Sequence, residues 1–282
     1  SMVSKEFADF IIKYDLRQSY SNYFYGFDGH DDLRNLYGAK YLLSHEDVEL
    51  AGYDKYGEYE DVKIYVNKNY VGLSCAYDAV VNSEQILGLD KTMQTSVLYD
   101  VCVSDTAKVS SDAPLIFDIR DEKVPYSTRY DSENGVLWLL LDRENDQSLQ
   151  LEFECDENVP LKINYSAEDK ISEELGFSII TQQHTQSWSI PLIRTKIIAI
   201  NGTKEALESI NNINIYTRKD AEIEEKARTL KNSGMNIKEL SEGNITGIAR
   251  LDSEKTMVFS IPYDKGWKIY VDGKEVASQL IN

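Results

Sequence analysis

The stretch SLQLEFEC, at residues 148–155, decides the fold class predicted for this chain of 282 residues. Every second side chain in it is apolar, namely Leu149, Leu151, Phe153 and Cys155. The side chains between them are polar, and successive side chains of a β-strand point to opposite faces of the sheet. The pattern therefore predicts an antiparallel strand with one face in a core and the other toward water.

Short runs of this kind recur along the chain between residues 70 and 200. They are PLIFDIR, VLWLLLDR, PLKINYS, SWSIPLI and RTKIIAI, and turn-forming clusters such as DSENG and RENDQ lie between them. Many short strands at regular spacing are typical of a β-sandwich. We therefore predict an α+β, β-dominated fold. Its centre is an antiparallel β-sandwich, jelly-roll-like, flanked by smaller α/β parts.

Helices are predicted before, within and after this strand-rich part. Residues 5–14 have apolar side chains at helical spacing, and DKTMQTSVLYD is the helix expected within the central part. Asp31 or Asp32 can cap a short helix that ends at Gly38, before the strand KYLLS.

The last predicted helix covers residues 219–233, with Thr217 or Asp220 as its cap. Its buried stripe is Ile223, Ala227 and Leu230. Gly234 is expected to end the helix in the left-handed conformation.

The change of pattern along the chain predicts three units. Residues 1–70 form a small α+β segment, residues 71–202 the β-sandwich domain, and residues 203–282 an α+β domain that ends in a β-hairpin. In that hairpin Asp272 and Gly273 supply the positive φ angles of a two-residue turn.

The chain is strongly acidic, with 48 Asp and Glu against 30 Lys and Arg and a formal net charge of −18 at pH 7. This charge argues against nucleic acid and anionic lipid head groups as partners, because both would be repelled. No window approaches the roughly 20 apolar residues that span a bilayer, and the first residues do not resemble a signal peptide. The cysteines Cys75, Cys102 and Cys155 are far apart and are predicted to be buried free thiols.

Motifs that carry catalysis do not occur in the sequence. It has no nucleophile elbow, no zinc-protease motif, no phosphate loop and no dinucleotide-binding glycine pattern, and its three histidines lie far apart. DSENG and DRENDQ depart from the calcium-loop pattern and are predicted to be hairpin turns. Helix capping explains the acidic cluster in FDGHDD at residues 27–32 as well as a cation site does. We assign no catalytic residue, no metal site and no cofactor to the chain.

Three segments resemble a known family, the final extracytoplasmic region of bacterial YfhO-like membrane proteins. The most specific segment is ITGIARLDSEKTMVFSIPYDKGWKIYVDGKEV at residues 245–276, with its Ser-Ile-Pro-Tyr, Gly-Trp and Val-Asp-Gly elements. LRNLYGAKYLLS at residues 33–44 and IYVNKNYVGLSCAYD at residues 64–78 are weaker matches. The resemblance covers both ends of the chain and not its β-rich middle.

The resemblance implies a large polytopic membrane protein of GT-C-type glycosyltransferase architecture, of which this chain is the outward-facing soluble region. Such relatives are thought to transfer lipid-linked sugars to cell-wall polymers such as teichoic acids outside Gram-positive cells. The catalytic acid would lie in a membrane loop outside this chain, and the full-length enzyme could use a divalent cation. The implied partners are a cell-wall glycopolymer or lipid-linked sugar and the protein's own transmembrane domain.

The resemblance also implies that the terminal hairpin is an interior one, followed by further strands and a last membrane helix. Its outer edge at residues 275–281 is therefore expected to be loosely paired.

Two other functions stay open at this point. One is a secreted or surface carbohydrate-binding β-sandwich without catalysis; the other, least favoured, is an independent glycosidase built on a chance carboxylate pair. Candidate carbohydrate-binding residues are Trp267, Tyr263 and Tyr270. For Trp267 the preferred interpretation is an anchor that packs the hairpin on the core together with Ile269 and Val271.

Overall fold

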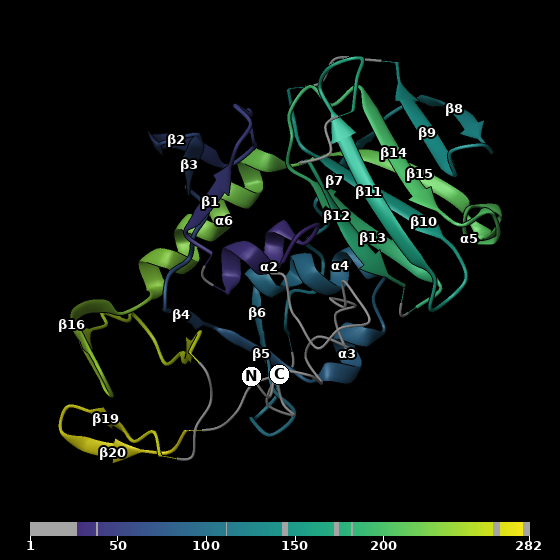
Figure 1. The fold of residues 1–282 in the computed structure, drawn as a ribbon. Coiled ribbons are helices and arrows are strands. Elements are labelled where there is room, and N and C mark those ends of the chain that lie inside the picture. The colour runs from purple at the N-terminus through teal and green to yellow at the C-terminus, as the bar shows by residue number, and fades with distance from the viewer. Residues whose placement is uncertain are drawn as a thin grey trace.

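Two β-sheets packed face to face form the centre of the protein. The computed structural model describes residues 27–37, 39–110, 112–142, 146–171, 175–181, 183–261 and 266–278. One sheet has the order β13–β10–β15–β7 and the other β12–β11–β14–β9–β8, with antiparallel pairing throughout (Figure 1). The first consists of β7 (Arg120–Lys123), β10 (Leu149–Glu154), β13 (Thr185–Ile190) and β15 (Asn211–Arg218). The second consists of β8 (Tyr126–Asp131), β9 (Val136–Leu141), β11 (Pro160–Ser166), β12 (Gly176–Ile180) and β14 (Ile197–Gly202). The β-dominated α+β fold with a central sandwich is confirmed.

The sandwich core forms as the alternating pattern of residues 148–155 predicts. Leu149, Leu151, Phe153 and Cys155 are at most 1 % exposed and pack against apolar residues of the facing sheet. The polar face of β10 is less hydrated than predicted, because Gln150 is buried as well. This face of β10 lies toward α4 (Lys91–Ser96), the helix predicted within the central part.

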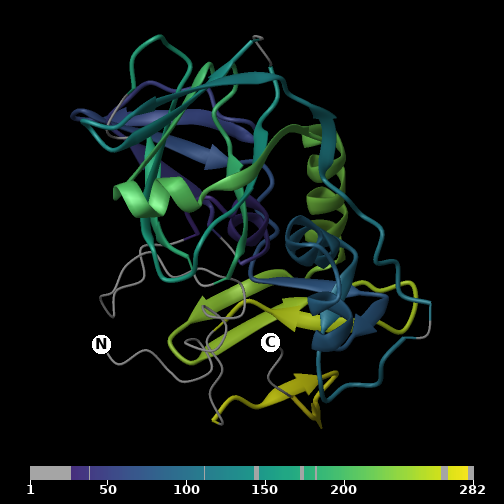
Figure 2. The ribbon, with the colours of Figure 1, turned by 90° about the vertical axis from the view of Figure 1, so that its right-hand side faces the viewer.

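A second core lies beside the sandwich, between short strands and helices. Its helices are α2 (Asp31–Leu36), α3 (Ser83–Leu87), α4, the 3₁₀ helix η1 (Val97–Tyr99) and α6 (Asp220–Ser233). Its strands are β4 (Ser74–Tyr77), which pairs with β18 (Thr256–Phe259), and β5 (Ala79–Val81), which runs parallel to β6 (Val101–Val103). Figure 2 shows α6 beside the sandwich, with the short strands of this second core below it. The predicted stripe Ile223, Ala227 and Leu230 is buried in this core, as expected.

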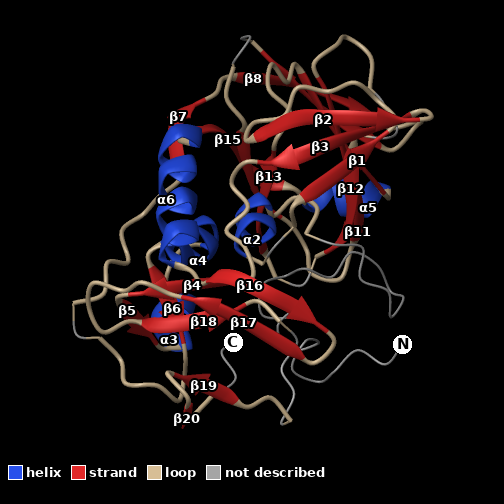
Figure 3. Ribbon diagram, turned by 90° about the vertical axis from the view of Figure 1, so that its left-hand side faces the viewer, coloured by secondary structure: helices blue, strands red, loops and turns tan. Residues whose placement is uncertain are grey.

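A small sheet and two hairpins complete the described structure (Figure 3). The sheet has the order β1–β3–β2, from β1 (Tyr41–Ser44), β2 (Tyr53–Tyr59) and β3 (Val62–Asn67). The hairpins are β16 (Asn236–Ser241) with β17 (Asn244–Ile248), and β19 (Ile269–Val271) with β20 (Lys274–Val276). Asp272 and Gly273 have the predicted positive φ angles, and α5 (Lys204–Ser209) follows β14.

Strand pairing crosses the predicted boundary at residue 202 in two places. β15 follows residue 202 and pairs with β10, while β18, from the last unit, pairs with β4. The division into units at 1–70, 71–202 and 203–282 stays a prediction. The helix predicted at residues 5–14 and the helix end at Gly38 lie outside the described residues.

The predicted side-chain caps of two helices are wrong, because these carboxylates bind elsewhere. Neither α2 nor α6 has a side-chain cap at its N-terminus. Asp31 and Asp32 face arginines, and Asp220 accepts hydrogen bonds from the backbone N–H (2.8 Å) and Oγ (2.5 Å) of Ser148.

The predicted left-handed Gly234 is also wrong, since its backbone is extended, with φ −76° and ψ 177°. A Cβ at Gly234 would lie 2.1 Å from the carbonyl oxygen of Ser74. Glycine is needed there because β4 approaches the helix end closely.

Candidate functional site

Asp31 and Asp32 of the FDGHDD segment are buried, while Asp28 is half exposed. Arg218, at the end of β15, contacts Asp32 at 2.7 Å and Asp31 at 3.4 Å, and its side chain is 3 % exposed. Arg34 contacts Asp31 and Asp28, both at 3.2 Å. Two guanidinium groups thus face three carboxylates, which join α2 to the strand that leads into α6.

Hydrogen bonds extend this cluster toward the small sheet. The Tyr99 hydroxyl donates to Asp32 at 3.3 Å, and the Asn35 amide donates to the Tyr99 hydroxyl at 2.8 Å. Asn67, at the end of β3, donates to Asn35 at 2.8 Å. The network therefore connects β3, α2, η1 and β15, and it fixes their relative positions.

Burial and ion pairing shift the pKa values of Asp32 and Arg218 in opposite directions. Burial raises the pKa of Asp32, although the neighbouring Arg218 lowers it. Burial alone would lower the pKa of Arg218, but the Asp32 and Asp31 carboxylates outweigh it and the pKa is raised. Arg218 thus stays charged, and its ion pairs offset the cost of removing these charges from water.

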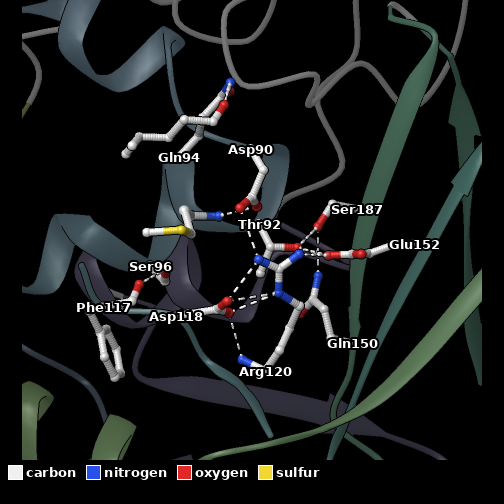
Figure 4. A network of polar contacts seen from close by, with 12 residues as sticks. Asp90, Thr92, Gln94, Ser96, Phe117, Asp118, Arg120, Gln150, Glu152 and Ser187 are labelled. Atoms are coloured by element: carbon white, nitrogen blue, oxygen red, sulfur yellow. Dashed lines mark hydrogen bonds and ion pairs between the residues drawn. The ribbon is translucent and has the colours of Figure 1, made fainter. Parts of the chain in front are cut away.

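A second network surrounds Arg120 on the polar side of β10 (Figure 4). The guanidinium lies between Asp118 at 2.8 Å, Asp90 at 2.9 Å and Glu152 at 2.9 Å. Burial would raise the pKa of Asp118, but the hydrogen bonds from Arg120 outweigh it and hold this pKa below its usual value. Asp90 also caps α4 by accepting from the backbone N–H of Met93, so the cluster anchors this helix on the sheet.

Neutral side chains continue this network between α4 and the sheet. Thr92 donates to Glu152 and lies 2.7 Å from the Ser187 hydroxyl, to which the Gln150 amide donates at 2.8 Å. Thr92 is 1 % exposed, so this hydroxyl serves packing and not chemistry on a ligand. The Gln150 amide nitrogen is thus satisfied, whereas its Oε1 is buried without a hydrogen-bond partner among the described residues.

Sequence reasoning missed both networks. Arg34, Arg120 and Arg218 were given no role, and the carboxylates of FDGHDD were assigned to capping. The sequence signal is the position of Arg120 directly after Ile119 in an apolar run, and of Arg218 at the end of the strand INIYT. Their partners could not be read from it, because Arg218 and Asp32 are 186 residues apart.

The predicted carbohydrate-binding residues lie at the terminal hairpin. Tyr263 lies outside the described residues, Trp267 is half-buried and Tyr270 is 57 % exposed. Val271, expected to pack on the core beside Trp267, is 56 % exposed. The hairpin pairs with no other described strand, and its residues 275–278 are exposed. A carbohydrate site at Trp267, Tyr263 and Tyr270 stays a prediction.

Of the remaining sequence candidates, DRENDQ lies partly outside the described residues, and the others are placed as follows. DSENG forms the β8–β9 turn, in which Asp131 accepts from the backbone N–H groups of Glu133 and Asn134. Cys75, Cys102 and Cys155 are free and buried. In the described part of the chain no group of acidic, histidine and cysteine side chains is arranged to hold a metal ion.

Comparison with known protein families decides the relationship of the chain. The model of the family described as bacterial membrane protein YfhO matches residues 1–282. The chain belongs to this family. The match includes the β-rich middle, for which the sequence motifs gave no resemblance. Curated proteins and solved structures gave no match.

Membership in the YfhO family associates the chain with a membrane protein. The chain itself shows no helix, among the residues described, that is long and apolar enough to cross a bilayer. The networks around Arg120 and Arg218 then serve a YfhO-family region whose sheets and helices are held in one arrangement by buried ion pairs.

Proposed function

We propose that this chain is the extracytoplasmic region of a polytopic membrane glycosyltransferase and that it positions the substrates of the transfer. The substrates would be a lipid-linked sugar and a cell-wall polymer such as a teichoic acid. The observation that carries the proposal is the match of the YfhO membrane protein family to all 282 residues. Catalysis is assigned to membrane loops outside this chain, as the resemblance implies.

The architecture supports a positioning role. A region that orients a polymer has to be rigid, because fixed geometry lowers the entropic cost of bringing reactants together. The sandwich and the second core are joined by buried ion pairs, which include Arg218 with Asp32 at 2.7 Å. These contacts favour a rigid support above the membrane.

The net charge limits what the region binds. At −18 the chain repels polyanions such as teichoic acids. We therefore propose that the contacts are made to uncharged sugar units, or that divalent cations of the full-length enzyme bridge the two. Strong dependence of polymer binding on added Mg²⁺ would favour bridging by divalent cations.

The test compares the isolated chain with the full-length protein. A strain that lacks the gene should regain glycosylated wall polymer when it expresses the full-length protein. A full-length protein without residues 27–278 should be inserted in the membrane and fail to restore glycosylation. The purified chain should show no sugar transfer and no sugar hydrolysis. Turnover by the purified chain would refute the proposal, and so would full activity of the shortened protein.

A further inference from the structure

The outer face of the small β1–β3–β2 sheet is aromatic and exposed. Strand register places Tyr41 opposite Val66, Leu43 opposite Ile64, and Tyr59 opposite Val62. Directly opposed residues of antiparallel strands share one face, so these side chains lie together. Tyr41 is 50 % exposed, Leu43 65 %, and Tyr56 and Tyr59 each 70 %. We call the four exposed side chains Tyr41, Leu43, Tyr56 and Tyr59 the tyrosine platform.

Tyr56 joins the platform through an irregularity of β2. The pairing register shifts between Lys55 and Gly57, and the Tyr56 ring lies 6.0 Å from the Tyr41 ring at 59°. Gly57 is opposite Ile64, and a Cβ added at Gly57 would meet no atom within 4 Å. The platform is therefore open to solvent beside the Tyr56 ring.

The other face of this sheet is covered around Tyr65, while Lys55 and Glu58 on the same face are exposed. Tyr65 is buried, and Leu42 and Tyr53 pack against the sandwich core. The bridge between Leu50 and Leu192 ties the segment that leads into β2 to the sandwich. A ligand would therefore meet a sheet that is already fixed to the sandwich, which lowers the ordering cost of binding.

The charges that border the platform nearly balance. Asp54 and Lys68 form an ion pair at 3.4 Å near the Tyr41 end, and the ammonium of Lys40 lies 5.1 Å from the Tyr41 ring centre. At the opposite end Glu60 and Asp61 form the turn, and Asp61 is 3.2 Å from His45. In a chain of net charge −18, this surface is matched to an uncharged ligand with many hydroxyl groups.

The size of the platform selects among neutral partners. An exposed tyrosine offers roughly half to two thirds of about 200 Å², so the four side chains present about 400 to 500 Å². A stable protein partner needs about 800 Å² on each side, which is more than the platform provides. From Val62 to Val66 the strand extends about 13 Å, longer than a single pyranose ring.

We propose that the tyrosine platform binds a neutral oligosaccharide of hexose or N-acetylhexosamine units. The apolar faces of the sugar rings stack on Tyr56 and Tyr59, and their hydroxyls hydrogen-bond to Asp54 and Lys68. This site is distinct from Trp267, Tyr263 and Tyr270. It rests on the proposed function in that the bound glycan is the sugar-bearing substrate that the region positions.

The first experiment is a screen of the purified chain on neutral hexose and N-acetylhexosamine oligosaccharides, followed by calorimetric titration of the best ligand. The test variant is Tyr56→Ala with Tyr59→Ala. Each ring removed should weaken binding about two- to tenfold, the range of a single aromatic contact. The matched variant Tyr56→Phe with Tyr59→Phe keeps the rings and should bind within about threefold of the unmodified chain. Tyr130→Ala, an exposed tyrosine on β8 of the sandwich, should bind unchanged.

A second variant blocks the platform without removing a ring. Gly57→Val adds a side chain to open space at a strand position that suits valine, so the melting temperature should not fall. Its oligosaccharide binding should weaken. Unchanged binding in both Gly57→Val and the double alanine variant overturns the proposal.

Other outcomes also overturn it. These are no binding to any neutral oligosaccharide, equal loss of binding in Tyr130→Ala, and platform-dependent binding to phosphatidylcholine and phosphatidylglycerol vesicles instead of sugar. The proposed function is tested separately, by wall-polymer glycosylation in cells. If the full-length protein with the double alanine variant glycosylates normally and the chain binds no oligosaccharide, the platform proposal fails and the proposed function stands.

Discussion

Replacing Arg218 by methionine removes the cation that two buried carboxylates share. The Arg218 guanidinium lies 2.7 Å from Asp32 and 3.4 Å from Asp31. At an effective dielectric constant of about 20, these contacts correspond to gross Coulomb energies of about 6 and 5 kcal/mol. Desolvation offsets most of this sum. Loss of one partner of a buried pair costs about 3 to 5 kcal/mol, which is the destabilisation expected for Arg218→Met at pH 7.

The loss should depend on pH, and its sign follows from Asp32. Burial raises the pKa of Asp32 even with Arg218 present, and removal of Arg218 takes away the group that lowers it. The folded variant then holds a proton at pH values where the unfolded chain, with a pKa near 3.9, has released it. Its free energy of unfolding therefore falls as the pH rises above about 4. The deficit relative to the unmodified chain should be larger at pH 7 than at pH 4.5.

Denaturant unfolding at both pH values measures these differences. A matched variant with Asp32→Asn and Arg218→Met removes both members of the closer ion pair and leaves Asp31 paired with Arg34, so it should recover most of the stability and lose the pH dependence. The reasoning is refuted if Arg218→Met costs less than about 1 kcal/mol at pH 7, or if its deficit is the same at both pH values.

Three further predictions concern the cores and the thiols. Leu151→Ala should lower the free energy of unfolding by about 3 to 5 kcal/mol, since Leu151 is fully buried; a loss below 1 kcal/mol in denaturant unfolding would contradict it. Gly234→Ala should lower the melting temperature, because its Cβ would lie 2.1 Å from the Ser74 carbonyl oxygen; Gly88→Ala, whose Cβ has 3.5 Å of room, is the control that should not. Burial raises the pKa of Cys75 to about 11 and that of Cys102 to about 12, so at pH 7 both thiols should react with a disulfide reagent only after urea is added, and fast labelling of the folded chain would exclude this.

The strands of the sandwich were predictable because their signal is local. Alternation along residues 148–155 specifies which side chains enter the core. The apolar ones are buried accordingly, namely Leu149, Leu151, Phe153 and Cys155. The helix over Asp220–Ser233 was predictable for the same reason, since Ile223, Ala227 and Leu230 lie on one face.

The buried charges were not predictable, because their meaning depends on residues far along the chain. Asp31 and Asp32 satisfy the local rule for helix capping equally well, and only the approach of Arg218 determines their role. Gly234 shows the same limit. Its position after a helix is typical of a left-handed cap, yet the close approach of Ser74 is the constraint that requires glycine.

The tyrosine platform was the feature least predictable from the sequence. Aromatic residues in strands are usually half-buried, so no single tyrosine in YDKYGEY indicates exposure. The exposed face emerges from the register of β1, β3 and β2 and from the irregularity at Lys55 and Gly57. Sequence patterns carry neither feature.

The pairing of β4 with β18 has a consequence for the order of events while the chain is being made. Ser260 bonds to the carbonyl oxygen of Gly72, 188 residues earlier, and Thr256–Phe259 completes the sheet begun by Ser74–Tyr77. At about 5 to 20 residues per second, the first strand waits roughly 10 to 40 s for its partner. The edge of β4 that pairs with β18 stays uncovered during that time. The nascent chain is therefore expected to need chaperone protection until nearly all of this region has been synthesised.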